Sequence, residues 1–170
     1  KRSWDLARLN HDHRGQYIAT KNIAINAKNS IHDSPVLLLN VIRSGIDLAC
    51  TITDASSNKI LAETDAYIQQ FTQDYSDTSA FKEQMYVVKA RLHNVREEKA
   101  KAEKLVETHL SVKPSESIED NLDKVKVFHE LGMREEANIL LRAIKNQVAG
   151  DSLTNEVLSQ YVEQESNNRA

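Results

Sequence analysis

The apolar residues of the chain recur with the period of an α-helix along most of its length. In the last third they stand at Ala137, Leu140, Leu141, Ile144 and Val148. This spacing of i, i+3, i+4, i+7 and i+11 places them on one helix face. No segment alternates between apolar and polar residues over enough positions to predict a strand. The pattern therefore predicts an all-α protein.

Residues that favour helix ends divide this pattern into about nine predicted helices. Ser34 and Pro35 offer an N-cap followed by proline at the first helical position. Gly15, Gly132 and Gly150 are expected to end helices. The predicted helices cover residues 3–14, 17–31, 35–52, 57–75, 79–94, 96–110, 117–131, 134–149 and 152–165. No Gly or Pro marks a break within residues 79–110. Whether this segment forms one helix or two is therefore left open, although its length favours two.

The composition favours the same fold class. Among the 170 residues there are only 4 Gly and 2 Pro, about 3.5% together, where average usage is roughly 12%. Sandwiches, barrels and α/β folds need these residues at their many turns, so the scarcity argues against all three. Aromatic residues make up 5% of the chain, and we therefore expect a mostly aliphatic core.

Charge, hydropathy and cysteine content limit the partners and the compartment. A formal net charge of −3 is a poor match for nucleic acid. No apolar stretch approaches the ~20 residues that a membrane span needs. The single cysteine, Cys50, lies in an apolar run, so we expect a buried structural thiol and a cytoplasmic protein. Because the chain begins with Lys1 rather than Met, we expect it to be a piece of a longer protein.

Pairs of predicted helices recur at intervals of roughly 34 to 44 residues, which indicates a repeat. Ala90, Ala102 and Ala137 stand where the two helices of a hairpin would cross. A methyl side chain lets two helix backbones approach to about 8 Å, whereas a leucine would hold them apart. Gly45 is expected to face a neighbouring helix in a more divergent hairpin. The predicted repeats cover residues 1–34, 35–76, 79–116 and 117–150, followed by a terminal helix at 152–165.

Three of these windows resemble the tetratricopeptide repeat (TPR). The residues that carry the resemblance are Trp4, Gly15, Tyr17 and Ala27 in the first window, Ala90, Ala102, Leu110 and Pro114 in the second, and Phe128, Gly132, Ala137 and Leu141 in the third. The resemblance implies antiparallel helix hairpins stacked as a short right-handed superhelix, in a single domain over residues 1–170.

A narrower resemblance concerns two stretches, HDSPVLLLNVIRSGIDLA and FHELGMREEANILLRAI. Together they look like the helical C-terminal region of bacterial response regulators, in which a phosphoacceptor receiver domain precedes degenerate TPRs. The sequence contains no strand followed by an acidic pocket, so the receiver domain itself is not part of it. This resemblance implies a role in bacterial signal transduction.

No residue pattern typical of catalysis or of metal binding occurs in the sequence. The six histidines are not spaced as metal ligands, and HExxH, CxxC, GxSxG and Gly-rich phosphate loops are all missing. We therefore expect no enzymatic activity, no cofactor and no metal. The charge distribution is uneven, because residues 82–104 hold seven basic and four acidic residues, whereas residues 115–170 hold six and eleven. This asymmetry suits an acidic partner segment or self-association, and an ordinary mixed helical surface explains it equally well.

We accordingly expect a non-catalytic scaffold that binds a partner protein or peptide in the concave groove of stacked hairpins. The expected binding residues are exposed polar side chains of the first helices: Asn10, Arg14, Asn40, Arg43, Lys89, His93 and Lys124.

The alternative is a dimerisation or regulatory effector module of a response regulator that acts by helix association. Its interface would be the apolar strip of the last helix, formed by Val157, Tyr161 and Val162, and the protein would then be a homodimer. Reading of RNA by helical repeats is disfavoured by the charge balance and by the lack of an aromatic or arginine ladder.

Overall fold

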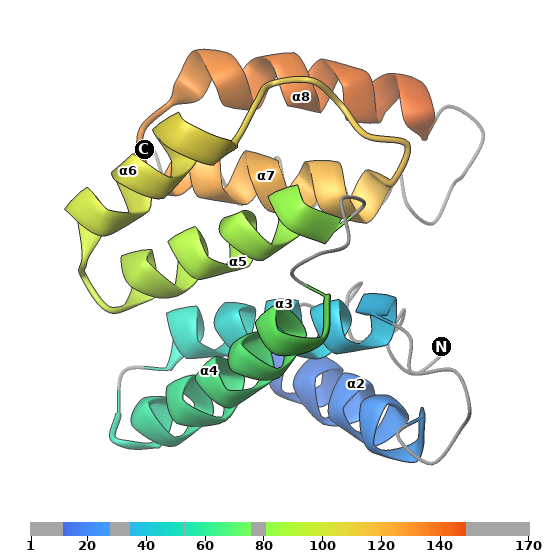
Figure 1. The fold of residues 1–170 in the computed structure, drawn as a ribbon, viewed down its shortest axis with the longest axis vertical. Coiled ribbons are helices and arrows are strands. Elements are labelled where there is room, and N and C mark those ends of the chain that lie inside the picture. The colour runs from blue at the N-terminus through green and yellow to red at the C-terminus, as the bar shows by residue number, and fades with distance from the viewer. Residues whose placement is uncertain (1–11, 28–34, 53, 76–80, 149–170) are drawn as a thin grey trace.

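The computed structural model describes residues 12–27, 35–52, 54–75 and 81–148 (Figure 1). These residues form seven helices and no strand, which confirms the all-α class. The helices are α2 (His13–Ala27), α3 (Pro35–Thr51), α4 (Ser56–Tyr75), α5 (Lys82–Val95), α6 (Lys99–His109), α7 (Ile118–Glu130) and α8 (Arg134–Gln147). The described residues thus hold seven helices rather than about nine. The predicted helix at 152–165 and most of that at 3–14 lie outside them.

The start of α2 differs from the prediction. The helix begins at His13, and Gly15 lies inside its first turn. Asp12 caps it, because its Oδ1 accepts the Gly15 N–H at 2.8 Å and its carbonyl accepts the Gln16 N–H at 2.9 Å. The prediction that Gly15 ends a helix is therefore wrong, since the aspartate three residues before it turns the same position into a helix start.

Within the segment 79–110, the described residues form two helices, α5 and α6, joined by a tight turn. Glu97 adopts a left-handed backbone conformation there, with φ of 61°. Its N–H donates to the Asn94 carbonyl at 3.0 Å, and the Glu98 N–H donates to the His93 carbonyl at 2.8 Å. The same Schellman motif ends α7, with Gly132 at φ 74° as its left-handed residue. Gly132 was predicted to end a helix and does so.

Most of the helix contacts join neighbours in sequence, and α5 connects two groups of helices. Contacts join α2 to α3, α3 to α4, α5 to α6 and α7 to α8, while α5 also contacts α3, α4 and α7. In Figure 1 the helices α2 to α4 form one group and α5 to α8 the other. The described residues form three apolar cores. Val87 and Ala90 of α5 belong to the core shared with α6 to α8, and Val88 and Leu92 belong to the core shared with α3 and α4. A third core joins α2 to α3.

Small residues occupy the positions at which the sequence predicted close contacts between helices. Ala90, Ala102 and Ala137 are all fully buried in the core that α5 to α8 share. Gly45 is buried in the middle of α3, and a Cβ atom there would overlap Oγ1 of Thr64 on α4 and lie 3.1 Å from Cε1 of Tyr17. The prediction that Gly45 faces a neighbouring helix is confirmed.

Two further sequence expectations concern α3 and the membrane. Cys50 is exposed, so the prediction of a buried thiol is wrong. Its apolar neighbours Leu48 and Ala49 are buried, but Cys50 follows Arg43 and Asp47 on the polar stripe of α3, at spacings of four and three residues. Among the described helices, none combines the length and the apolar character that a membrane crossing requires.

Candidate functional site

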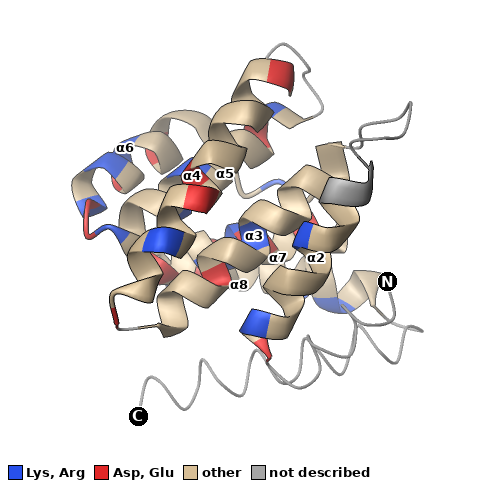
Figure 2. Cartoon of the chain, turned by 90° about the horizontal axis from the view of Figure 1, so that it is seen from below, with Lys and Arg blue, Asp and Glu red and all other residues tan. Residues whose placement is uncertain are grey.

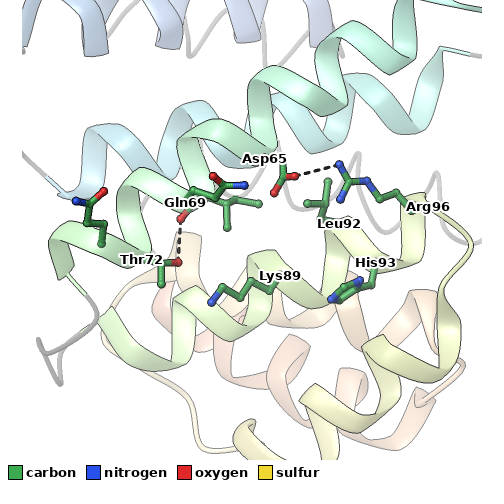
Figure 3. A pocket seen from close by; sticks show the side chains of 9 residues that line it. Asp65, Gln69, Thr72, Lys89, Leu92, His93 and Arg96 are labelled. Carbon is green, nitrogen blue, oxygen red and sulfur yellow. Dashed lines mark hydrogen bonds and ion pairs between the residues drawn. The ribbon is translucent and has the colours of Figure 1, made fainter.

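A groove with a volume of about 430 Å³ lies between α4 and α5 (Figure 3). Each wall is one face of a helix, because its residues recur at helical spacing. The α4 wall consists of Asp65, Ile68, Gln69, Thr72 and Gln73, and the wall of α5 and its C-cap consists of Lys89, Leu92, His93 and Arg96.

The floor of the groove is apolar and its rim is polar. Ile68 and Leu92 are almost fully buried and belong to the core that α3, α4 and α5 share. Gln69 and Gln73 are exposed on the α4 rim. The Thr72 hydroxyl donates to the Ile68 carbonyl of its own helix at 2.9 Å. The groove thus offers an apolar contact flanked by side chains that form hydrogen bonds.

Two of the three basic residues of the groove already have acidic partners. Arg96 Nη2 lies 3.3 Å from Asp65 Oδ2, and this ion pair closes one end of the groove between the two helices (Figure 3). His93 Nδ1 lies 3.2 Å from Glu98 Oε1. Hydrogen bonds from Lys101 and then from His93 lower the pKa of the Glu98 carboxyl.

Lys89 is the basic residue of the groove that has no ion pair or hydrogen bond within the described part of the chain. It is half-buried on α5. Figure 3 shows its side chain in the gap between the helices, on the side that faces Gln69 and Thr72. The groove therefore holds an amino group, next to an apolar floor, for which the described residues provide no counter-charge.

Two other residues that were expected on the binding surface lie inside the protein. Lys124 is 1% exposed, and its ammonium donates to Glu83 Oε1 at 2.9 Å and to the Lys113 carbonyl at 3.1 Å. Arg43 binds Asp120 through Nη2 at 2.6 Å and Asp123 through Nε at 3.2 Å. The expectation that these two side chains are exposed is wrong, because acidic residues of other helices bind both of them.

Arg43 belongs to a buried network of ion pairs between α3, α5 and α7. Arg91 of α5 lies at the centre of this network. Arg91 Nη2 lies 2.9 Å from Asp47 Oδ1 and 3.1 Å from Glu130 Oε1. Lys126 Nζ also binds Asp47, at 3.1 Å. Burial acts to raise the pKa of the Asp47 carboxyl, but Lys126 and Arg91 outweigh it and hold the pKa well below its ordinary value. In Figure 2 blue and red positions lie close together where α3 and α7 meet.

Two further predicted residues, Arg14 and Asn40, do not line the groove. Arg14 is exposed near the start of α2, and Asn40 is half-buried on α3. Asn10, Val157, Tyr161 and Val162 lie outside the described residues. Of the predicted binding residues, the structure brings Lys89 and His93 together.

The α4 wall was missed by sequence reasoning. Its signal was the series Asp65, Gln69 and Gln73, at i, i+4 and i+8, beside the apolar Ile68. Such a series marks one face of a helix but does not indicate which helix lies opposite.

Within the described ranges, no three or more His, Cys, Asp or Glu side chains are grouped so that they could hold a metal ion. No protein-family model, curated protein or solved structure matches the chain significantly. The geometry of the groove is therefore the basis for a functional proposal.

Proposed function

We propose that the protein is a non-catalytic scaffold that binds a peptide segment of a partner protein in the groove between α4 and α5. The observation that carries this proposal is a groove with two helix faces as walls, an apolar floor at Ile68 and Leu92, and a polar rim. Binding sites of this kind bury apolar side chains of the ligand and orient it with a few polar groups.

The rim provides the groups that an extended peptide needs. The amides of Gln69 and Gln73 each offer donors and an acceptor, so they can pair with peptide N–H and C=O groups. Lys89 and His93 stand across the groove from them. Apolar pockets flanked by hydrogen-bonding side chains are a recurring way to hold a peptide.

The helix contacts support a TPR-like arrangement as part of this proposal. On that assignment α3, α5 and α7 are the first helices of successive hairpins, and α3 contacts α5 while α5 contacts α7. Stacked repeats contact their neighbours in this way. The charged side chains of these first helices bind one another in the network around Arg91, so we place the binding site between one hairpin and the next.

Selection from a displayed library of random short peptides, with the full chain as bait, tests the proposal. The Gln69→Trp substitution fills the groove, and we expect it to lower the affinity for the selected peptides at least about tenfold. The double variant Lys89→Ala/His93→Ala should also lower the affinity for these peptides, while circular dichroism shows unchanged helicity. Lys104→Ala, an exposed lysine of α6 outside the groove, is the matched control. Peptides whose affinity survives both groove variants would contradict the proposal.

A role in bacterial signal transduction is a separate part of the proposal, and the sequence resemblance alone supports it. A receiver domain encoded upstream of Lys1 would support this role, and a full-length protein without one would count against it. The cytoplasmic location and the self-association of the last predicted helix stay predictions.

A further inference from the structure

We infer that the groove selects acidic peptides, with a ligand carboxylate bound by Lys89 and an apolar ligand side chain seated on Ile68 and Leu92. This inference rests on the proposed function and names the chemistry of the partner. Its starting point is the unequal pairing of the basic residues in the groove. Arg96 is paired with Asp65, and His93 contacts Glu98. Lys89 is left without an acidic partner among the described residues.

A half-buried ammonium gains most from a partner that carries a negative charge. An amino group at the rim has lost part of its water, and a carboxylate replaces that water with a charge-assisted hydrogen bond. Neutral peptides would leave the Lys89 ammonium partly desolvated and unpaired, which is unfavourable. The groove therefore discriminates by charge at this one position.

The charges around the groove do not supply this selectivity. Helix α6 follows directly after the α5 wall and exposes Lys99, Lys101 and Lys104. Lys101 is paired with Glu98, and Lys99 lies 3.7 Å from Glu103, so blue and red positions both mark this helix in Figure 2. The protein as a whole carries a net charge of −3. The preference for an acidic ligand therefore has to come from the Lys89 ammonium itself.

The spacing along α5 predicts the order of the ligand residues. Lys89 and Leu92 are three residues apart, which corresponds to a rise of about 4.5 Å along the helix. In an extended peptide, side chains two residues apart lie on the same side and about 6.6 Å from each other. The flexible lysine side chain makes up the difference. The expected ligand core is thus an acidic residue, any residue, and an apolar residue, in either chain direction.

A carboxylate suits this site better than a phosphate group does. Arginine binds a phosphate group through two parallel hydrogen bonds of its planar guanidinium, whereas lysine binds it only as a point charge. The arginine of the groove, Arg96, is directed at Asp65 (Figure 3). The remaining cation, Lys89, offers a single point charge, which matches one aspartate or glutamate.

The test compares fluorescein-labelled peptide pools that share flanking sequence and differ in a fixed core. The cores are Glu-x-Leu, Gln-x-Leu and Glu-x-Ser, with their reversed orders, and binding to the full chain is followed by fluorescence anisotropy. We expect Glu-x-Leu or its reverse to bind at least about tenfold tighter than the matched Gln and Ser pools. In about 1 M NaCl, where the Debye length falls to about 3 Å, the advantage over Gln should shrink.

Lys89→Gln and Lys104→Gln separate groove recognition from general charge attraction. Lys89→Gln should abolish the preference for Glu over Gln, whereas Lys104→Gln should keep it. Equal binding of the Glu and Gln pools, both weakened by Gln69→Trp, would overturn the acid preference and leave the groove as the binding site. A Glu preference that survives Lys89→Gln would also overturn it. Failure of every pool, together with no groove-dependent peptide from the random library, would overturn the proposed function itself.

Discussion

Arg91 on α5 donates from Nη1 to Oδ1 of Asp123 on α7 over a distance of 3.2 Å, and each side chain is only 3% exposed. The same guanidinium binds Asp47 of α3 and Glu130 of α7. None of the three apolar cores of the described helices contains buried side chains of both α3 and α7. The direct connection between these two helices is therefore ionic: Arg43 binds Asp120 and Asp123, and Lys126 binds Asp47.

The first prediction concerns Arg91. We expect Arg91→Met to lower the free energy of unfolding by about 3–5 kcal/mol, because it leaves the carboxylates of Asp47 and Asp123 buried with too few cations. Urea unfolding followed by circular dichroism measures the change. Arg96→Met is the matched control: it removes the more exposed ion pair with Asp65 and should cost at most about 1 kcal/mol. Similar losses in the two variants would show that burial of the network is not important for stability.

The second prediction concerns acid. Lys126 and Arg91 overcome the effect of burial and hold the pKa of Asp47 well below its ordinary value, which is about 3.9 in an unfolded chain. The folded state therefore binds this proton less readily than the unfolded state. The contribution of Asp47 is fully present above pH ~4 and is lost as the pH falls toward the folded pKa.

Urea unfolding at a series of pH values tests this effect. Below pH ~4 the contribution of one such carboxyl approaches about 1.4 kcal/mol per pH unit. Lys126→Gln removes one of the two cations that bind Asp47, so the pKa of this carboxyl rises toward its unfolded value and the loss of stability below pH ~4 should become smaller. An equally large loss in that variant would contradict the assignment of Asp47 as an acid-sensitive group.

The third prediction uses the two Schellman motifs. Glu97 occupies the left-handed position that Gly132 occupies at the end of α7, and a side chain at such a position costs roughly 1–2 kcal/mol. We expect Glu97→Gly to raise the free energy of unfolding by about 1 kcal/mol and Gly132→Ala to lower it by a similar amount. No heavy atom lies within 4 Å of the Cβ position at Gly132, so the second change tests backbone conformation alone. A destabilised Glu97→Gly protein would mean that its side chain has a stabilising role.

The fourth prediction concerns the contact between α3 and α4. A methyl group at Gly45 would overlap Oγ1 of Thr64, a buried hydroxyl without a hydrogen-bond partner in the part of the chain that the structure describes. Gly45→Ala should therefore destabilise the protein, and Thr64→Ala should relieve part of that loss. A double-mutant cycle with thermal unfolding should give a coupling free energy of about 0.5–3 kcal/mol between the two sites. Additive effects of the two substitutions would show that the contact between Gly45 and Thr64 does not determine the distance between α3 and α4.

The helices themselves were largely predictable from sequence, because apolar period and capping residues act locally. Pro35 begins α3 and Tyr75 ends α4 as predicted. The turn at Glu97 was hard to locate, since glutamate is not the residue that usually takes a left-handed conformation. The backbone N–H groups of Glu97 and Glu98 form the hydrogen bonds that stabilise this turn. Such backbone bonds depend on the conformation of the turn rather than on one residue type.

The residues of the groove were harder to predict than the helices. A lysine on a helix face gives the same sequence signal whether water or a carboxylate lies beside it. Lys89 and Lys124 illustrate this: the first reaches a groove, whereas the second is buried against Glu83, 41 positions earlier in the chain. Burial of charge depends on such distant partners. The opposite wall of the groove, on α4, could be recognised only after the fold had brought α4 beside α5.

Helix α5 contributes side chains to two of the apolar cores, and this determines which parts of the molecule unfold together. Arrays of stacked repeats often fray from their ends, because each repeat contacts only its neighbours. Here Val88 and Ala90 lie two residues apart, on opposite sides of α5, and belong to different cores. Arg91 of the same helix binds acidic residues of both α3 and α7. Loss of either core would remove the apolar packing on one side of α5. We therefore expect slowly exchanging amide hydrogens of α3, α5 and α7 to open together, in one cooperative unit that crosses the boundary between hairpins.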